Sequence, residues 1–213
     1  MTERVLHLST TDIQGGAARG AYWLHRAFAA SGVDSLMLVD RKYSDDDTVL
    51  APANGGPFVR RLRAYADALP LYRYNRTGEA YWSVNWVPTR MGRLIDAIDP
   101  DIVHLHWSGG GFVPIQQLKD FRRPVVWTLR DMWPLTGGCH YTAGCDRYRT
   151  GCGRCPQLRS SVDDDLSRHV FERKRVHWRG VDLWLVPIGT WLADVARRSP
   201  LFSGAPIEVI PNG

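Results

Sequence analysis

The sequence predicts an α/β protein built on a doubly wound, mostly parallel sheet with a small cysteine-rich insertion. Short β-rich apolar runs alternate along the chain with stretches whose apolar residues recur at helical spacing. The length of 213 residues, with 44% hydrophobic and 23% charged residues, fits a folded domain with a full core. We therefore treat residues 1–213 as one domain, which a cysteine-rich segment at 137–156 interrupts.

The first part of the chain reads as a strand, a helix and a second strand. A buried strand at Val5–Ser9 is followed by a polar, glycine-rich turn over Thr10–Gly16. From Ala17 the apolar residues repeat at helical spacing as far as Gly32, which is typical of a helix C-terminus. Ser35–Val39 is the second predicted strand.

The alternation continues after an exposed loop marked by the acidic run 45–47 and the cluster Asn54–Pro57. Phe58–Leu69 is predicted to be an amphipathic helix, and Pro88 fits the first turn of a helix that runs to Ile98. The remaining predicted elements are strands at 101–105, 125–129, 183–186 and 208–210, and helices at 163–178 and 191–198.

All four cysteines fall in one short segment with the spacing C-x5-C-x6-C-x2-C. In a reducing compartment such a cluster indicates a metal site, and four thiolates fill every coordination position of a structural zinc ion. An iron–sulfur cluster would use the same ligands, and two disulfides would need an oxidising compartment. We predict one structural zinc ion with four ligands: Cys139, Cys145, Cys152 and Cys155.

Polar residues follow several predicted strands, at the edge where an open parallel sheet binds its ligands. Because the carboxyl ends of parallel strands meet at one edge, these side chains are candidates for a shared site. They are Thr10, Gly15 and Gly16 after the first strand, Asp40 after the second, His104 and His106 at the end of the third, and Arg130 and Asp131 after the fourth.

Gly15 and Gly16 open a helix directly after a strand, which is a favourable place for a phosphate group. Backbone N–H groups can approach the phosphate closely there, and the helix dipole adds partial positive charge. A tight turn that needs glycine for its geometry is the simpler alternative. The dinucleotide fingerprint G-x-G-x-x-G is broken at Ala17, which disfavours a nicotinamide-dependent oxidoreductase although Asp40 sits where a ribose-binding carboxylate is expected.

His104 and His106 alternate along a strand, so both side chains point to the same face. A histidine in this position is often structural, and either one is a candidate for contact with substrate. Asp131 ends a strand beside Arg130, where an ion pair or a cap is the structural alternative to a site role. We predict Asp131, His106 and His104 as catalytic candidates, and Arg130 with the two glycines as the phosphate-binding group.

The net charge of +5 favours an anionic partner such as a nucleotide sugar, a lipid phosphate or a membrane surface. Basic charge and the cysteines also suggest a nucleic-acid-binding module, but a zinc ribbon does not need an α/β scaffold of this size. The N-terminus lacks the features of a signal peptide, and no apolar stretch is long enough to span a membrane. We expect a cytoplasmic protein. The basic amphipathic segment 58–69 is either a solvated helix face or a peripheral contact with the membrane.

The sequence resembles bacterial family 4 glycosyltransferases of the colanic-acid and exopolysaccharide type. The resemblance spans the chain and is most specific in the cysteine region. It is carried by Val125–Trp133, Thr136–Cys139, Gly144–Asp146, Thr150–Cys152 and Cys155–Gln157, with Asp101–Trp107, Trp191–Ala193, Arg197–Ser199 and Val209–Gly213 in support.

This resemblance implies the N-terminal, acceptor-side half of a GT-B fold and retaining transfer of a sugar from a nucleotide-sugar donor. The acceptor would be a saccharide or a polyprenyl-linked sugar, and Gly15 and Gly16 would approach the donor diphosphate. A second, donor-binding domain is absent from these residues, so the fragment alone is expected to be inactive. Relatives commonly carry His-Asp where this chain has Arg130-Asp131; arginine cannot act as a base but binds phosphate or carboxylate.

Overall fold

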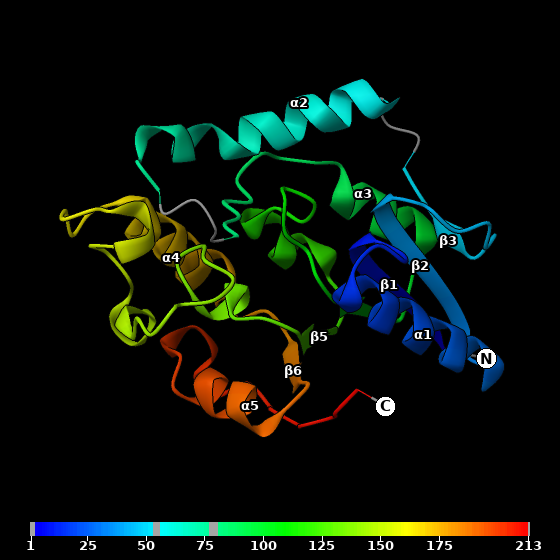
Figure 1. Cartoon of the computed structure of the whole chain (residues 1–213). Coiled ribbons are helices and arrows are strands. Elements are labelled where there is room, and N and C mark those ends of the chain that lie inside the picture. The colour runs from blue at the N-terminus through cyan, green and yellow to red at the C-terminus, as the bar shows by residue number, and fades with distance from the viewer. Residues whose placement is uncertain (1–2, 53–55, 77–80, 213) are drawn as a thin grey trace.

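The computed structural model describes residues 3–52, 56–76 and 81–212. Six strands form one sheet in the order β3-β2-β1-β4-β5-β6, and every pair is parallel (Figure 1). The predicted doubly wound α/β class is confirmed. The strands are β1 (Arg4–Thr11), β2 (Asp34–Arg41), β3 (Val49–Leu50), β4 (Ile102–Leu105), β5 (Val125–Leu129) and β6 (Leu183–Pro187).

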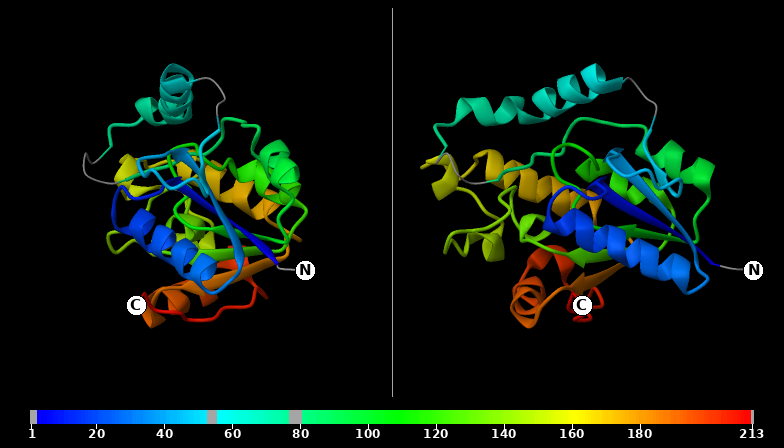
Figure 2. Two further views of the ribbon diagram at one scale, coloured as in Figure 1. Left: turned by 90° about the vertical axis from the view of Figure 1, so that its right-hand side faces the viewer. Right: turned by 45° about the vertical axis from the view of Figure 1, so that its right-hand side comes forward.

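Helices flank the sheet, as right-handed crossovers between parallel strands require. The α-helices are α1 (Gly16–Ala30), α2 (Gly56–Ala68), α3 (Met91–Ile98), α4 (Leu166–His177) and α5 (Thr190–Arg197). Helix α1 packs against β1 and β2, whereas α3 and α4 pack on the 3-10 segment Ile115–Phe121. Helix α2 lies on the outside of the domain, at the top of both views in Figure 2.

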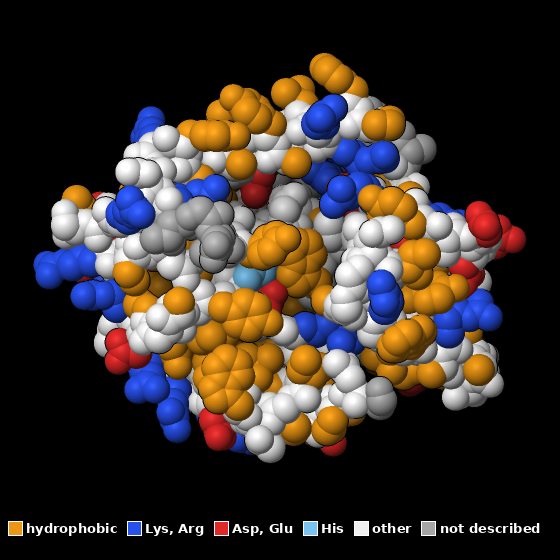
Figure 3. All heavy atoms as spheres, viewed as in Figure 1, with side chains coloured by type: hydrophobic (Ala, Val, Ile, Leu, Met, Phe, Trp, Pro, Cys, Tyr) orange, Lys and Arg blue, Asp and Glu red, His pale blue; other side chains and the backbone are white. Residues whose placement is uncertain are grey.

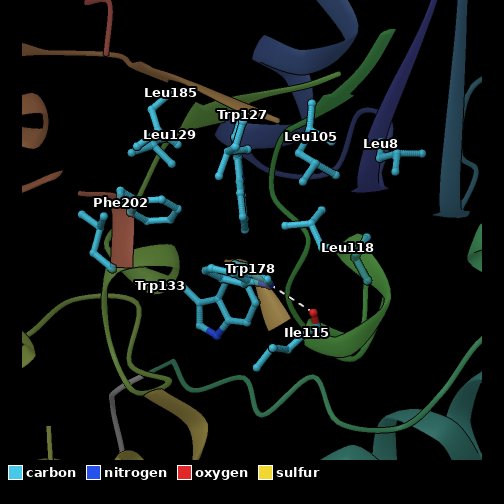
Figure 4. Close-up of a cluster of buried hydrophobic side chains, with 14 of the residues drawn as sticks. Leu8, Leu105, Ile115, Leu118, Trp127, Leu129, Trp133, Trp178, Leu185 and Phe202 are labelled. Carbon is cyan, nitrogen blue, oxygen red and sulfur yellow. Dashed lines mark hydrogen bonds between the residues drawn. The ribbon is translucent and has the colours of Figure 1, made fainter. Parts of the chain in front are cut away.

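The two faces of the sheet bury different kinds of side chain. Alternate residues of β1, β4, β5 and β6 form a large apolar cluster with Trp133, Trp178 and Phe202, and Figure 4 shows part of it. The indole Nε1 of Trp178 donates to the carbonyl oxygen of Ile115 at 3.0 Å, which satisfies the polar atom of this buried ring. The opposite face, under α1, carries Met37 and Val39 together with several histidines.

Some predicted boundaries are wrong for local chemical reasons. The third helix begins at Met91, so Pro88 precedes it, and the hydroxyl of Thr89 accepts from the Met91 N–H at 3.2 Å. Helix α4 begins at Leu166 because the carboxylate of Asp165 caps its first turn. The short strand β3 was not predicted. The cluster Asn54–Pro57 lies partly outside the described residues, and its remaining residues begin α2.

The predicted strand at 208–210 is also wrong, although the chain does run beside β6. Glu208 N donates to Leu185 O at 3.0 Å and Ile210 N donates to Pro187 O at 3.2 Å. The only ladder contact of this segment among the described residues is an isolated bridge between Leu185 and Ile207. Pro187 and Pro206 lack the N–H groups that would donate to Glu208 O and Leu183 O, so a continuous ladder cannot form.

The loops at the carboxyl edge of the sheet are tied together by hydrogen bonds. The buried carboxylate of Asp12 accepts from the backbone N–H groups of Ile13, Tyr43 and Ser44 at 2.8–3.0 Å, which joins the loops after β1 and β2. Thr10 N donates to Trp107 O at 2.9 Å, which joins the end of β1 to the loop after β4. The strand order reverses between β1 and β4, so this junction is the topological switch point where such sheets bind ligands.

Three histidines from two neighbouring strands form a buried cluster under α1. His7 Nδ1 lies 3.0 Å from His106 Nε2, and His104 Nε2 lies 2.8 Å from the hydroxyl of Thr128. Burial, followed by the charge of Arg130, lowers the pKa of His104 to about 3. Burial also holds the pKa of His7 and His106 well below the usual value, and neighbouring histidines add to the effect. The cluster is therefore neutral in the folded protein.

Because the folded pKa values are depressed, the unfolded chain binds protons more tightly below pH 6.5. The stability that the neutral cluster contributes is complete above the unfolded pKa and is lost as the pH falls towards the folded values. For each buried histidine, the free energy of unfolding should fall by about 2 kcal/mol between pH 7 and pH 5. In urea titrations, the free energy of unfolding of His7→Gln should depend less steeply on pH than that of the native protein. The exposed His169→Gln should keep the native pH dependence. Equal slopes in all three proteins would contradict this account.

Candidate active site

An open pocket of about 400 Å³ lies at the switch point of the sheet. It brings together the first turn of α1, the loops after β4 and β5, the start of the cysteine segment and the C-terminal stretch. Its lining residues are Gly16, Ala17, Tyr81, Trp107, Arg130, Asp131, His140, Tyr141, Ile188 and Asn212. Three residues that the sequence singled out, Gly16, Arg130 and Asp131, thus line one pocket.

The N-terminus of α1 faces this pocket without a capping side chain. Gly15 is the N-cap with φ of 90°, a backbone conformation that favours glycine, and no acidic residue lies in the first turn. A Cβ atom at Gly15 or Gly16 would meet no protein atom within 4 Å. The space beside the free N–H groups is therefore open to a ligand, and the helix dipole favours an anionic one.

Arg130 lies on the α1 side of the pocket. Its Nη1 donates to the side-chain oxygen of Asn212 at 2.8 Å, and no ion pair of the described residues includes this guanidinium. A Cβ atom at Gly20 would lie 2.6 Å from Arg130 Nη1, so the glycine leaves the room in which the guanidinium packs on the helix. Arg130 is a fixed cation without a carboxylate partner in this part of the structure.

Asp131 lies opposite, with its carboxylate held by surrounding donors. Oδ2 accepts from Trp107 Nε1 at 2.9 Å and from His140 Nδ1 at 2.7 Å, and Oδ1 accepts from the Trp133 N–H at 2.9 Å. The side chain of Asp131 is 11% exposed. The structure therefore presents a largely buried, oriented carboxylate on the pocket wall.

The other predicted candidates lie elsewhere. His104 and His106 are buried under α1 and do not line the open pocket, although His106 lines a cavity of about 10 Å³ behind Trp107 and Asp131. Asp40 forms an ion pair with Arg63 of α2. The sequence did not identify His140 as a site residue. It stands next to Cys139 in the predicted metal-binding segment, and no sequence pattern marks it as a partner of Asp131.

The four cysteines line one small pocket of about 20 Å³ and all are free thiols. That volume has room for one to two waters or a single ion. Burial raises the pKa of Cys139 and Cys152 to about 12 and also raises that of Cys155. These thiols are therefore protonated unless a cation binds them.

The donor set fits zinc, but the sulfur atoms are not drawn together as a bound ion would hold them. In a tetrahedral site with Zn–S bonds of ~2.3 Å, the sulfurs lie about 3.8 Å apart. Among the described residues, His7, His104 and His106 are the one group of three or more candidate ligands whose atoms all lie within 4.8 Å of one another. Zinc would have to draw the thiols inward. Gly151 and Gly153 flank Cys152, so the backbone at this ligand is free to adjust.

Buried Lys174 lies between this pocket and the Asp131 segment. Its Nζ donates to the carbonyl oxygens of Trp133 and Thr136 and lies 3.7 Å from the centroid of the Trp133 ring. Burial lowers the pKa of Lys174 to about 7, and Cys152 and Cys139 would oppose that shift in their thiolate form. A zinc ion with four thiolates carries a net charge of −2 and would supply a counter-charge for this ammonium.

Metal analysis of protein produced with zinc should find about one zinc per chain, because four thiols share a pocket large enough for one ion. Cys152→Ser should lose the metal and lower the melting temperature, since the loop has little core of its own. Arg149→Ser, an exposed change in the same loop, serves as the control and should retain the metal. Native protein that binds less than 0.1 equivalents under these conditions would remove the zinc assignment.

Comparison with known proteins identifies the family of this pocket-bearing domain. Residues 14–213 match the family described as Glycosyltransferase Family 4. The chain belongs to glycosyltransferase family 4. It is also similar to a protein of Escherichia coli (strain K12) named putative colanic acid biosynthesis glycosyl transferase WcaC, with 25% identity over 189 residues. That match covers 82% of this chain and 45% of the relative, so the chain spans about half the relative's length.

The family assignment confirms the resemblance seen in the sequence and agrees with an all-parallel, Rossmann-like sheet as one half of a GT-B fold. The match runs from residue 14 to residue 213 and so includes the cysteine segment. None of the described helices is both long and apolar enough to cross a bilayer.

Proposed function

We propose that this family 4 domain forms the acceptor-side half of a retaining glycosyltransferase that acts in polysaccharide biosynthesis. The observation that carries the proposal is the single pocket in which an uncapped helix N-terminus and Arg130 lie across from Asp131. An anion and a hydroxyl-bearing molecule can be held side by side there. The family membership and the name of the similar colanic-acid protein support sugar transfer as the reaction.

In this proposal the donor is a nucleotide sugar whose diphosphate lies near Gly15, Gly16 and Arg130. The backbone N–H groups and the guanidinium would stabilise the negative charge that develops on the leaving diphosphate. Arg130 has the geometry for this because its remaining N–H groups are not taken by a carboxylate among the described residues. A second domain would supply the rest of the donor site.

The acceptor is a saccharide or a polyprenyl-linked sugar, placed with one hydroxyl at Asp131. Tyr81 and Tyr141 are exposed at the pocket and Trp107 lines it, so the pocket offers aromatic faces beside a carboxylate. Such a combination suits a sugar ring, which has apolar C–H faces and polar edges. Asp131 would accept a hydrogen bond from the attacking hydroxyl and orient it towards the donor.

In the full-length protein, Asp131→Asn should lower kcat for sugar transfer by ~10²-fold, the scale of losing a positioned proton acceptor. The exposed Asp163→Asn is the matched control and should leave turnover unchanged. Transfer would be followed by release of the nucleotide from a panel of nucleotide sugars in the presence of a polyprenyl-linked acceptor. Native turnover in folded Asp131→Asn would exclude this role, and no transfer by native protein from any donor would overturn the proposed reaction.

We also propose that the exposed face of α2 contacts an anionic membrane, where a polyprenyl-linked acceptor resides. Asp67 is the one buried residue of α2, and the exposed side carries Phe58, Leu62 and Tyr65. Figure 3 shows hydrophobic side chains along this helix, at the top of the view, with basic side chains beside them. Arg60 and Arg61 on the same helix add positive charge, whereas Arg63 is paired with Asp40. Such a combination of basic and apolar side chains favours anionic lipid surfaces.

Co-sedimentation with vesicles should rise with the fraction of anionic lipid and fall with added salt, because several arginines approach the surface. Phe58→Ser combined with Tyr65→Ser should abolish it by removing the apolar anchors. Trp23→Ser, which changes an exposed aromatic on α1, is the matched control and should bind like the native protein. Equal binding to neutral and anionic vesicles would exclude the electrostatic contribution.

A further inference from the structure

His140 links the cysteine segment to the pocket through both its backbone and its side chain. Its N–H donates to Tyr81 O at 3.1 Å, and its carbonyl accepts from Met132 N at 2.9 Å. The side chain is 4% exposed, with Nδ1 at 2.7 Å from Asp131 Oδ2 and Nε2 at 2.9 Å from the hydroxyl of Ser83. Every polar atom of this residue therefore has a partner.

Counting donors and acceptors assigns the imidazole tautomer. A carboxylate only accepts, so the Nδ1 atom of His140 must carry the hydrogen that Asp131 receives. In the neutral imidazole Nε2 is then the acceptor, so the Ser83 hydroxyl donates to it, and Gly110 N donates to a lone pair of the same Oγ at 3.1 Å. Ser83 thus completes a directed chain of hydrogen bonds that ends on the carboxylate of Asp131.

The same counting shows what Asp131 has left to offer. A carboxylate has about four acceptor positions. His140, Trp107 and the Trp133 N–H occupy three of them. The remaining position is on Oδ1, and the carboxylate lies on the wall of the open pocket. The donors on Oδ2 therefore decide which way the last acceptor position points.

The cysteine segment holds this chain of hydrogen bonds in place. Trp82 and Cys139 form an antiparallel bridge, and Ser83 N donates to Gly138 O at 3.0 Å. The first two members of the hydrogen-bond chain, Ser83 and His140, are therefore the neighbours of Trp82 and Cys139 on one short ladder. Order in the cysteine segment is transmitted to Asp131 through these neighbouring residues.

We propose that His140 is a positioning residue that aims the free acceptor position of Asp131 at the acceptor hydroxyl. The proposal rests on the proposed function of Asp131 and gives the cysteine segment a role in the site beyond folding. Ser, His and Asp also form nucleophilic triads. Ser83 is 4% exposed and does not line the open pocket, so its hydroxyl serves as a hydrogen-bond donor here and not as a nucleophile.

Two substitutions at His140 separate its hydrogen bonds. The amide nitrogen of His140→Asn falls near the native Nδ1 and can still donate to Asp131. The longer side chain of His140→Gln reaches the position of Nε2 and loses the donor to Asp131. In the full-length protein we expect His140→Gln to lower kcat about 10- to 100-fold, the scale of losing a hydrogen bond that orients a functional side chain. The KM for the donor should stay near native, and His140→Asn should recover most of the turnover.

A second measurement tests the Ser83–His140–Asp131 hydrogen bonds without depending on catalysis. The indole N–H of Trp107 donates to the same oxygen of Asp131, so its NMR resonance reports the orientation of the carboxylate. Trp107→Phe assigns the resonance. Both His140 variants lose the imidazole ring, so the difference between them reports the hydrogen bond alone. We expect the Trp107 resonance to move in His140→Gln away from its position in His140→Asn. Ser83→Ala keeps the imidazole ring, and we expect it to shift the resonance from the native position.

Equal turnover and equal Trp107 resonances in the two His140 variants would overturn the positioning role, whether both are impaired or both are native. Separate Trp107 resonances in a protein that transfers no sugar would support the positioning of Asp131 while the proposed reaction fails. If His140→Gln does not fold, Ser83→Ala replaces it in the test, because this change removes only the hydroxyl that is hydrogen-bonded to His140 Nε2. A native Trp107 resonance and native kcat in Ser83→Ala would then overturn the proposal.

Discussion

The arrangement of the pocket depends on how one carboxylate is shared among three segments. Asp131 receives hydrogen bonds from Trp107 after β4, from Trp133 in its own loop and from His140 in the cysteine segment. Trp107 lies in the loop after β4, whereas Trp133 and His140 both lie in the long connection after β5, where Trp133 begins a short 3-10 helix. A buried carboxylate is costly unless its lone pairs are satisfied. The need to satisfy Asp131 therefore holds the loop after β4 against two parts of the connection after β5.

Much of the fold could be predicted because its signals are local. The strand Val125–Leu129 is apolar and follows a proline, and it was predicted with its observed bounds. Arg130 and Asp131 could be placed at a site because parallel strands end at one edge. The two residues of β3 were too short to give a pattern, and the proline-flanked segment 206–211 showed that an apolar run alone does not make a strand.

Other features of the site depend on contacts between residues far apart in sequence. His140 meets Ser83 across 57 residues, and Lys174 reaches Trp133 across 41. Lys174 stands in a run of charged residues in α4, so its sequence suggests a solvated helix face, yet it is fully buried. Its ammonium donates to two carbonyl oxygens and lies over an aromatic ring. No local sequence pattern predicts these contacts.

The histidines under α1 bear on the charge of the same pocket. Arg130 lies close enough to His104 and His106 to lower the pKa of both, after the larger effect of burial. A protonated histidine there would face a guanidinium that has no carboxylate partner among the described residues. Because the cluster stays neutral, the positive charge at this edge comes from Arg130 and from the N-terminus of α1, neither of which titrates near neutral pH. The charge that these two groups present to an anionic ligand is thus constant across the physiological range. Keeping the histidines neutral lowers the free energy of unfolding in acid.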